Sequence, residues 1–203
     1  MTFKYFDNPE VFIGFLEDET TCDICGEIKL CFDAQSFIGE DAISSICSEC
    51  LATGKLLEKE LFTCEGDISE LKRQIREINP AMGDDEIDVL AENKTLELEK
   101  TTPHLVTWQD WNWPCADGDY CKFIGYGSKP FYDVLALDGN GRKLFENSIY
   151  YELRDDSDIE QLWNEELPEK SINNYAESNN FSTVFYVFKS LISEKIITIW
   201  DCN

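Results

Sequence analysis

The stretch ICSECLATGK, residues 46–55, holds two cysteines separated by two residues, just before an expected helix start. A matching pair lies in TCDICG, residues 21–26, so that Cys22, Cys25, Cys47 and Cys50 form the pattern C-x2-C-x21-C-x2-C. Two cysteines at this spacing wrap one turn and present both sulfurs to one ion, and two such turns complete a tetrahedron. The pattern predicts one zinc ion bound by these four residues, and the alternative is four free thiols or adventitious disulfides.

A site in which cysteine fills all four positions leaves no place for water or substrate, so the predicted zinc is structural. Structural zinc contributes on the order of 10–16 kcal/mol, which exceeds what a segment of about 50 residues gains from its own small core. We therefore expect residues 1–65 to form a zinc-binding module, resembling a zinc ribbon or knuckle, that the metal folds.

Charge limits the classes of partner. The chain of 203 residues carries 41 acidic against 17 basic side chains, a formal net charge of −24. Such a surface repels nucleic acid and anionic membranes, and it favours either a basic protein partner or simple solubility. Basic stretches with interleaved aromatic residues are absent too, so neither direct nucleic-acid binding nor membrane binding is expected.

The cysteine count indicates the compartment. Nine cysteines are an odd number and favour thiolate–metal chemistry over a disulfide framework. The first residues lack the basic and apolar regions of a signal peptide, and no apolar run reaches the roughly 18–20 residues that cross a bilayer. We expect a cytoplasmic protein.

Residues 66–103 follow helical periodicity. Apolar residues three or four positions apart predict helices over residues 67–78 and 84–100, and Asp67 is a suitable cap for the first. This helical pair is expected to pack on the rest of the chain by its apolar stripes.

Residues 104–203 are aromatic and strand-like, and we expect them to pack with the zinc module as one unit. DGNG, residues 138–141, predicts a hairpin turn between two strands. An acidic helix is expected over residues 155–167, capped by Asp156 or Ser157. The last apolar runs predict a terminal β-hairpin. The expected fold class is α+β: a four-cysteine module, a helical pair and a β-rich C-terminal part.

Five stretches resemble the CbrC family of bacterial proteins. They are FKYFDNP at residues 3–9, CDICG at 22–26, ICSECLATGK at 46–55, KTTP at 100–103 and WQDWNWPCADGDYCKFIGYG at 108–127. The family is cysteine-rich and is associated with colicin resistance. The resemblance therefore implies protection against a protein toxin, with no established catalytic chemistry.

One departure from the family bears on a second metal centre. Family members often carry a further C-x2-C between the last two strands, where this chain has Ser190 and Ser193. A serine hydroxyl stays protonated at neutral pH and is a poor zinc ligand. The resemblance thus implies that a centre built with Cys115 and Cys121 has lost two ligands here, and we expect those two cysteines to be buried thiols.

The block from Trp108 to Gly127 concentrates tryptophan and acidic residues. It predicts a pocket or interface, because tryptophan and tyrosine give large contact areas at low entropic cost, or else a segment packed against the zinc module. Candidate partner-binding residues come from this block and from the acidic helix: Trp108, Trp111, Trp113, Asp117, Asp119, Tyr120, Asp156, Asp158 and Glu160.

The leading expectation is a non-enzymatic protein that binds and occludes a basic toxin domain. One alternative is a metal- or thiol-dependent enzyme that uses the region from Cys115 to Cys121, with His104 as the only histidine available as a base. The other is a structural adaptor in which zinc only holds shape.

Overall fold

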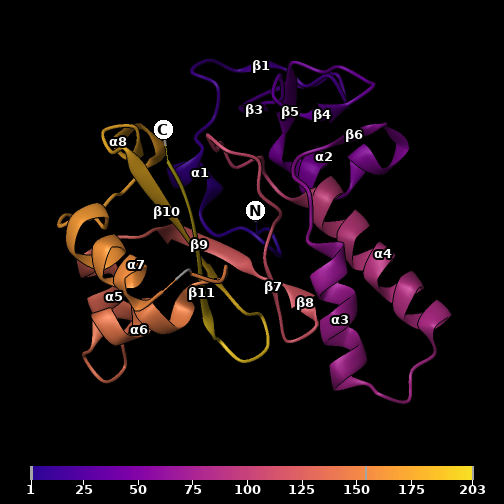
Figure 1. Cartoon of the computed structure of the whole chain (residues 1–203). Coiled ribbons are helices and arrows are strands. Elements are labelled where there is room, and N and C mark those ends of the chain that lie inside the picture. The colour runs from indigo at the N-terminus through magenta and orange to yellow at the C-terminus, as the bar shows by residue number, and fades with distance from the viewer. Residues whose placement is uncertain (1, 154, 203) are drawn as a thin grey trace.

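A three-stranded antiparallel sheet organises the C-terminal half of the chain (Figure 1). The computed structural model describes residues 2–153 and 155–202. The central strand β10 (Thr183–Lys189) pairs with β9 (Lys122–Tyr126) on one side and with β11 (Ile196–Cys202) on the other. The terminal β-hairpin predicted from the sequence is therefore confirmed, and so is the mixed helix and strand class.

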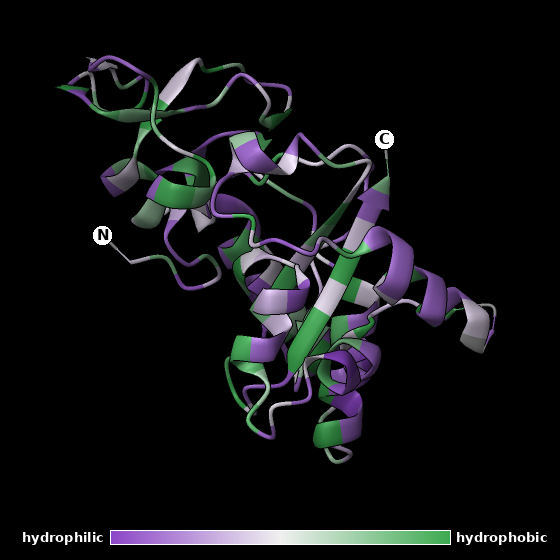
Figure 2. Cartoon of the chain, turned by 90° about the vertical axis from the view of Figure 1, so that its left-hand side faces the viewer, coloured by the Kyte–Doolittle hydropathy of each residue, from purple (hydrophilic) through white to green (hydrophobic). Residues whose placement is uncertain are grey.

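Both faces of β10 are buried. Tyr186 and Phe188 point into the larger hydrophobic cluster, whereas Phe185 and Val187 point into a smaller one on the opposite face. A strand covered on both sides reads as a continuous apolar run, which explains the sequence TVFYVFK. Figure 2 shows the hydrophobic colour along the strands of the sheet and the hydrophilic colour on the outer parts of the helices.

Helices cover one face of the sheet. They are α5 (Lys129–Leu135), α6 (Gly141–Ser148) and α7 (Asp156–Gln161), the last continued by the π-helical turn η2 (Leu162–Glu166). The cap of α7 is Asp155, whose side chain accepts from the Ser157 backbone N–H at 2.8 Å, and neither predicted cap fills that position.

The predicted hairpin around residues 138–141 is wrong, because helices flank this turn. Ser128 caps α5 by accepting from Phe131 N at 3.3 Å, and Asn140 caps α6 by accepting from Lys143 N at 3.0 Å. Short apolar runs fit a strand or a buried helix equally well, and packing on the sheet decides between them. Tyr132 and Phe145, both fully buried, supply that packing.

The aspartate–glycine hairpin lies elsewhere, between β7 (Cys115–Ala116) and β8 (Asp119–Tyr120). Asp117 and Gly118 at its turn have φ values of 58° and 77°. Two successive positive φ values define a type I′ turn, whose twist matches that of the flanking strands.

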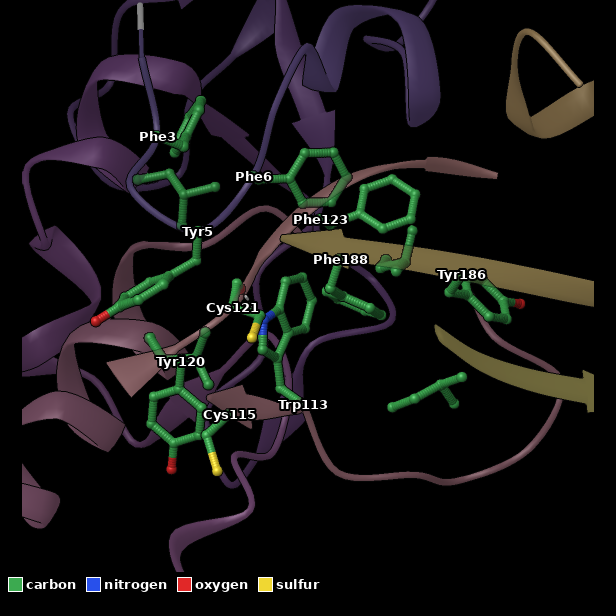
Figure 3. Close-up of a cluster of buried hydrophobic side chains, with 14 of the residues drawn as sticks. Phe3, Tyr5, Phe6, Trp113, Cys115, Tyr120, Cys121, Phe123, Tyr186 and Phe188 are labelled. Atoms are coloured by element: carbon green, nitrogen blue, oxygen red, sulfur yellow. Dashed lines mark hydrogen bonds between the residues drawn. The ribbon is translucent and has the colours of Figure 1, made fainter. Parts of the chain in front are cut away.

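The N-terminal residues belong to the central core. Phe6 forms a parallel bridge with Phe123, and their ring centroids lie 4.9 Å apart. Phe123 N donates to Tyr5 O at 2.8 Å. Figure 3 shows Phe6, Phe123, Phe188 and Trp113 grouped in this cluster. The helices α5–α7 pack into the smaller cluster on the other face of the sheet.

The predicted helical pair forms α3 (Ile68–Ile78) and α4 (Asp84–Thr101). Asp67 caps α3 as predicted and accepts from the Glu70 backbone N–H at 3.1 Å. Leu71 and Ile87 are fully buried between the pair and the rest of the chain. No helix in the described residues is both long and apolar enough to cross a membrane.

Short elements make up the N-terminal part of the chain, at the indigo and purple end of Figure 1, and residues 16–54 within it form the four-cysteine region. They are α1 (Pro9–Phe12), β1 (Thr20–Thr21), β2 (Ile28–Lys29), β3 (Cys31–Asp33), β4 (Ile38–Gly39), β5 (Ser45–Cys47), α2 (Ser48–Ala52), the 3-10 helix η1 (Lys55–Glu58) and β6 (Leu61–Phe62). A further short helix, α8 (Tyr175–Ser178), precedes β10. Buried residues of all three predicted segments, such as Leu51, Leu71 and Trp113, share one hydrophobic cluster.

Candidate metal centre

Two short turns position the four cysteines. Cys22 and Cys25 lie in the loop between β1 and β2, and this loop is closed by a hydrogen bond from Gly26 N to Cys22 O at 2.8 Å. Gly26 has φ +76°, a conformation that favours glycine. Cys47 ends β5, and Cys50 follows in the first turn of α2.

The sulfurs of these four cysteines converge. All four Sγ atoms lie within 4.8 Å of one another, and Cys25 Sγ is 4.0 Å from Cys47 Sγ. A metal–sulfur tetrahedron with bonds of about 2.3 Å places its sulfurs about 3.8 Å apart. The cluster can therefore hold a metal ion. Within residues 2–153 and 155–202 no other three histidine, cysteine or acidic side chains gather in this way.

Backbone donors favour a charged sulfur at Cys22. Burial acts to raise the pKa of this thiol, but N–H groups of Cys47, Cys25 and Ile24 outweigh it and lower the pKa to about 7. One of these bonds, from Cys47 N to Cys22 Sγ, is 3.3 Å long. Burial, followed by the neighbouring Cys47 and Cys25 thiols, raises the pKa of Cys50. A bound cation would let all four sulfurs carry charge together.

Asp23 ties the two cysteine turns together, and the sequence reasoning missed it. Its Oδ2 accepts hydrogen bonds from Ser44 N at 2.6 Å and from Ser45 N at 3.1 Å. Ser45 begins β5, the strand that ends at Cys47. The available signal was an aspartate inside the CDIC turn, because short acidic side chains bond nearby backbone N–H groups readily.

A family model described as "Uncharacterised protein family (UPF0167)" matches residues 1–202. The chain belongs to this family. It is the family of CbrC proteins, so the resemblance noted in the five sequence stretches is confirmed. No solved structure matches the chain.

In this CbrC-family chain, Ser190 and Ser193 both donate hydrogen bonds to the side-chain carboxylate of Asp117. Ser190 Oγ donates to Asp117 Oδ2 at 2.6 Å, and Ser193 Oγ donates to the same oxygen. These bonds hold the type I′ turn of β7–β8 against the turn of the terminal hairpin, and they lower the pKa of Asp117. Asp117 therefore links the β7–β8 turn to the turn of the terminal hairpin by hydrogen bonds.

Cys115 and Cys121 are buried thiols. The Cys115 Sγ lies 3.8 Å from the Tyr150 hydroxyl, and Cys121 lies beside the Trp113 indole, whose Nε1 donates to Cys121 O at 2.7 Å (Figure 3). Burial raises the pKa of Cys115 to about 12 and also raises that of Cys121. Neither thiol joins the four-cysteine cluster.

The structure places three of the candidate partner-binding residues in the core. Trp113 is 1% exposed and Tyr120 is fully buried, so neither presents its ring to a partner. Asp119 is 9% exposed and is held by Lys94 Nζ at 2.6 Å and by the Tyr5 hydroxyl at 3.0 Å. These three residues position the fold, which corrects the expectation that they form a docking surface.

The other two tryptophans are half-buried. Trp111 packs against Tyr186, with ring centroids 5.2 Å apart, and the backbone N–H of Trp108 donates to Asp201 Oδ2 at 2.9 Å. Asp117 is half-buried and engaged by the two serines. Only part of each tryptophan ring is therefore available at the surface.

The acidic helix packs on the opposite face of the sheet from the tryptophan block, because Ile159 belongs to the smaller cluster. Glu160 is exposed and lies 3.4 Å from Arg142 Nη2. Asp158 is half-buried, and the side chain of Asp156 lies outside the described part of the chain.

Proposed function

We propose that this CbrC-family chain is a non-catalytic cytoplasmic protein, folded around one structural zinc ion, that protects against a protein toxin by binding the toxin's basic domain. The observation that carries the proposal is the combination of a closed four-cysteine cluster with a net charge of −24.

Zinc is the metal that suits the cluster best. Four soft thiolates in a tetrahedral arrangement select zinc or iron–sulfur chemistry, and paired C-x2-C turns are typical of structural zinc sites. Sulfur fills every coordination position, so the ion would stabilise the fold and contribute no reactive water. Cys22, Cys25, Cys47 and Cys50 would hold it.

The charge indicates the class of partner. A surface with 41 acidic and 17 basic residues creates a negative potential that speeds encounter with a cationic protein. The same potential opposes nucleic acid, whose phosphates are anionic. A basic protein is therefore the partner that the charge selects.

The state of the cysteines argues against the thiol-enzyme alternative. The thiolate is the reactive form of cysteine, and a pKa of about 12 keeps Cys115 protonated at neutral pH. The adaptor alternative differs from the proposal in one expected result. It predicts that the chain binds a partner protein but does not protect cells from a toxin.

The test combines isolation from the native host with a protection assay. We expect the isolated protein to carry one zinc per chain and a cationic toxin domain, and we expect the complex to dissociate as salt rises, because surface charges are then screened. Cells that express the protein should survive the toxin. The proposal fails if no cationic toxin binds at low ionic strength and expression gives no protection.

A further inference from the structure

A cavity of about 540 Å³ lies where the four-cysteine region meets the segment after α4. Three stretches far apart in the sequence line it: residues around β4, residues 63–65 after β6, and residues 104–113. No lysine or arginine is among the described residues that line the cavity. Its ligand is therefore not an anion, which would need a cation to balance its charge.

Three side chains that line the cavity offer acceptors, and the indole N–H of Trp111 is a buried donor without a partner in the described part of the chain. His104 Nδ1 lies 2.7 Å from Thr63 O, and since a carbonyl oxygen only accepts, Nδ1 carries a proton, so that Nε2 is an acceptor whenever the ring holds this one proton. The carboxylates of Glu65 and Asp110 are exposed. Neither has a donor or cation as partner in the described part of the chain. A ligand rich in donors would complement all three groups.

Aromatic rings complete the wall. Trp111 and Trp113 both line the cavity, with ring centroids 6.4 Å apart. The negative face of an indole attracts a cation placed over it. Guanidinium meets every condition, because it is planar, permanently charged and weakly hydrated, and it has five donors and no acceptor.

We propose that this cavity binds the guanidinium group of an arginine side chain from the basic partner. Glu65 and Asp110 accept hydrogen bonds from the guanidinium, His104 Nε2 offers a further acceptor, and the half-buried Trp111 ring stacks on the planar group. The inference rests on the proposed function for the source of the arginine, while the site itself stands on the cavity alone.

The first arm of the test uses the full chain and two small probes, N-acetylarginine amide and its neutral isostere N-acetylcitrulline amide, with binding followed by NMR chemical shifts. We expect the arginine probe to bind about tenfold more tightly, a difference of about 1.4 kcal/mol. The resonances that shift should include the indole N–H of Trp111. Equal binding of the two probes, or no binding of the arginine probe, overturns the site.

The second arm compares two variants that change the net charge equally. E65Q/D110N removes the carboxylates at the cavity, and D18N/E92Q removes two exposed carboxylates outside its lining. We expect the first variant to bind the arginine probe about tenfold more weakly and the second to bind as the unmodified chain does. Equal weakening would show a general charge effect and overturn the site. Thermal unfolding checks that both variants keep their fold.

The third arm separates this inference from the proposed function. If a cationic toxin binds the unmodified chain and E65Q/D110N equally well, the toxin-binding function stands and the cavity is not its arginine site. If the arginine probe binds as expected but no toxin does, the guanidinium site stands and the toxin-binding function fails.

Discussion

Replacing Cys47 with serine removes one sulfur from the four-cysteine cluster, and we expect residues 16–54 to unfold while the sheet stays folded. The first twelve residues do not follow, because Phe6 is bridged to Phe123 and packs with the central core. The region that we expect to depend on a bound metal is therefore residues 16–54, which is shorter than the 65 residues expected from the sequence.

The magnitude follows from what else holds this region. The largest buried apolar side chains of residues 16–54 are Phe32, Ile46 and Leu51. Burying one such side chain contributes roughly 1.5–3 kcal/mol, so the three contribute roughly 4.5–9 kcal/mol before entropy is counted. Structural zinc contributes on the order of 10–16 kcal/mol. Bound zinc would thus contribute at least as much to stability as the apolar core of the region, and its loss should unfold the region.

Two measurements separate local from global unfolding. All five tryptophans lie beyond residue 107, so their fluorescence reports on the sheet and its surroundings. Hydrogen exchange of residues 16–54 reports on the cysteine region. For Cys47→Ser we expect loss of bound zinc and of exchange protection in this region, with tryptophan emission close to that of the unmodified chain.

Cys31→Ser is the matched control. Cys31 is fully buried and lies opposite Cys47 in the β3–β5 pair, but it is outside the cluster. Its Sγ lies 3.8 Å from Thr20 O, to which a serine hydroxyl can donate. This variant should keep its zinc and its protection. The reasoning is refuted if Cys47→Ser retains one zinc and full protection, or if both variants lose zinc alike.

Two further predictions concern the core around β8. A Cβ at Gly66 would lie 2.4 Å from the Tyr120 hydroxyl oxygen of a fully buried ring, so Gly66→Ala should lower the free energy of unfolding by about 1–3 kcal/mol in urea titration, and unchanged stability would contradict this. Burial acts to raise the pKa of Asp119, but Lys94, Lys4 and the Tyr5 hydroxyl together outweigh it, and the pKa lies below its usual range. A lowered folded-state pKa stabilises the fold above the unfolded value of about 3.9, and this contribution is lost as pH falls. Asp119→Asn should therefore be less stable than the unmodified chain at pH 7 and approach it below about pH 4, whereas a stability difference that persists in acid would count against the ion pair.

Local patterns were reliable wherever one face of one element decides the structure. The stripe of α3 and its cap at Asp67 were predicted because helical periodicity and capping act within a few residues. The same reasoning failed over residues 129–148, where apolar residues suit a strand and a buried helix alike. The aspartate–glycine pair at residues 117 and 118 could have predicted the β7–β8 hairpin from the sequence. Both residues have positive φ values in the structure, as a tight hairpin turn requires.

The sequence alone determined which residues can hold a metal, since the spacing within each C-x2-C pair fixes how two sulfurs share a turn, and it determined the net charge of −24. Only the tertiary structure decided which aromatic residues are exposed. Trp108 and Trp111 keep part of their rings at the surface while Trp113 is buried, although all three stand within six residues. Burial depends on segments that arrive from elsewhere in the chain, here Phe6 and Phe188 against Trp113. For the same reason the cavity beside His104, which joins three distant stretches, has no signature in any one of them.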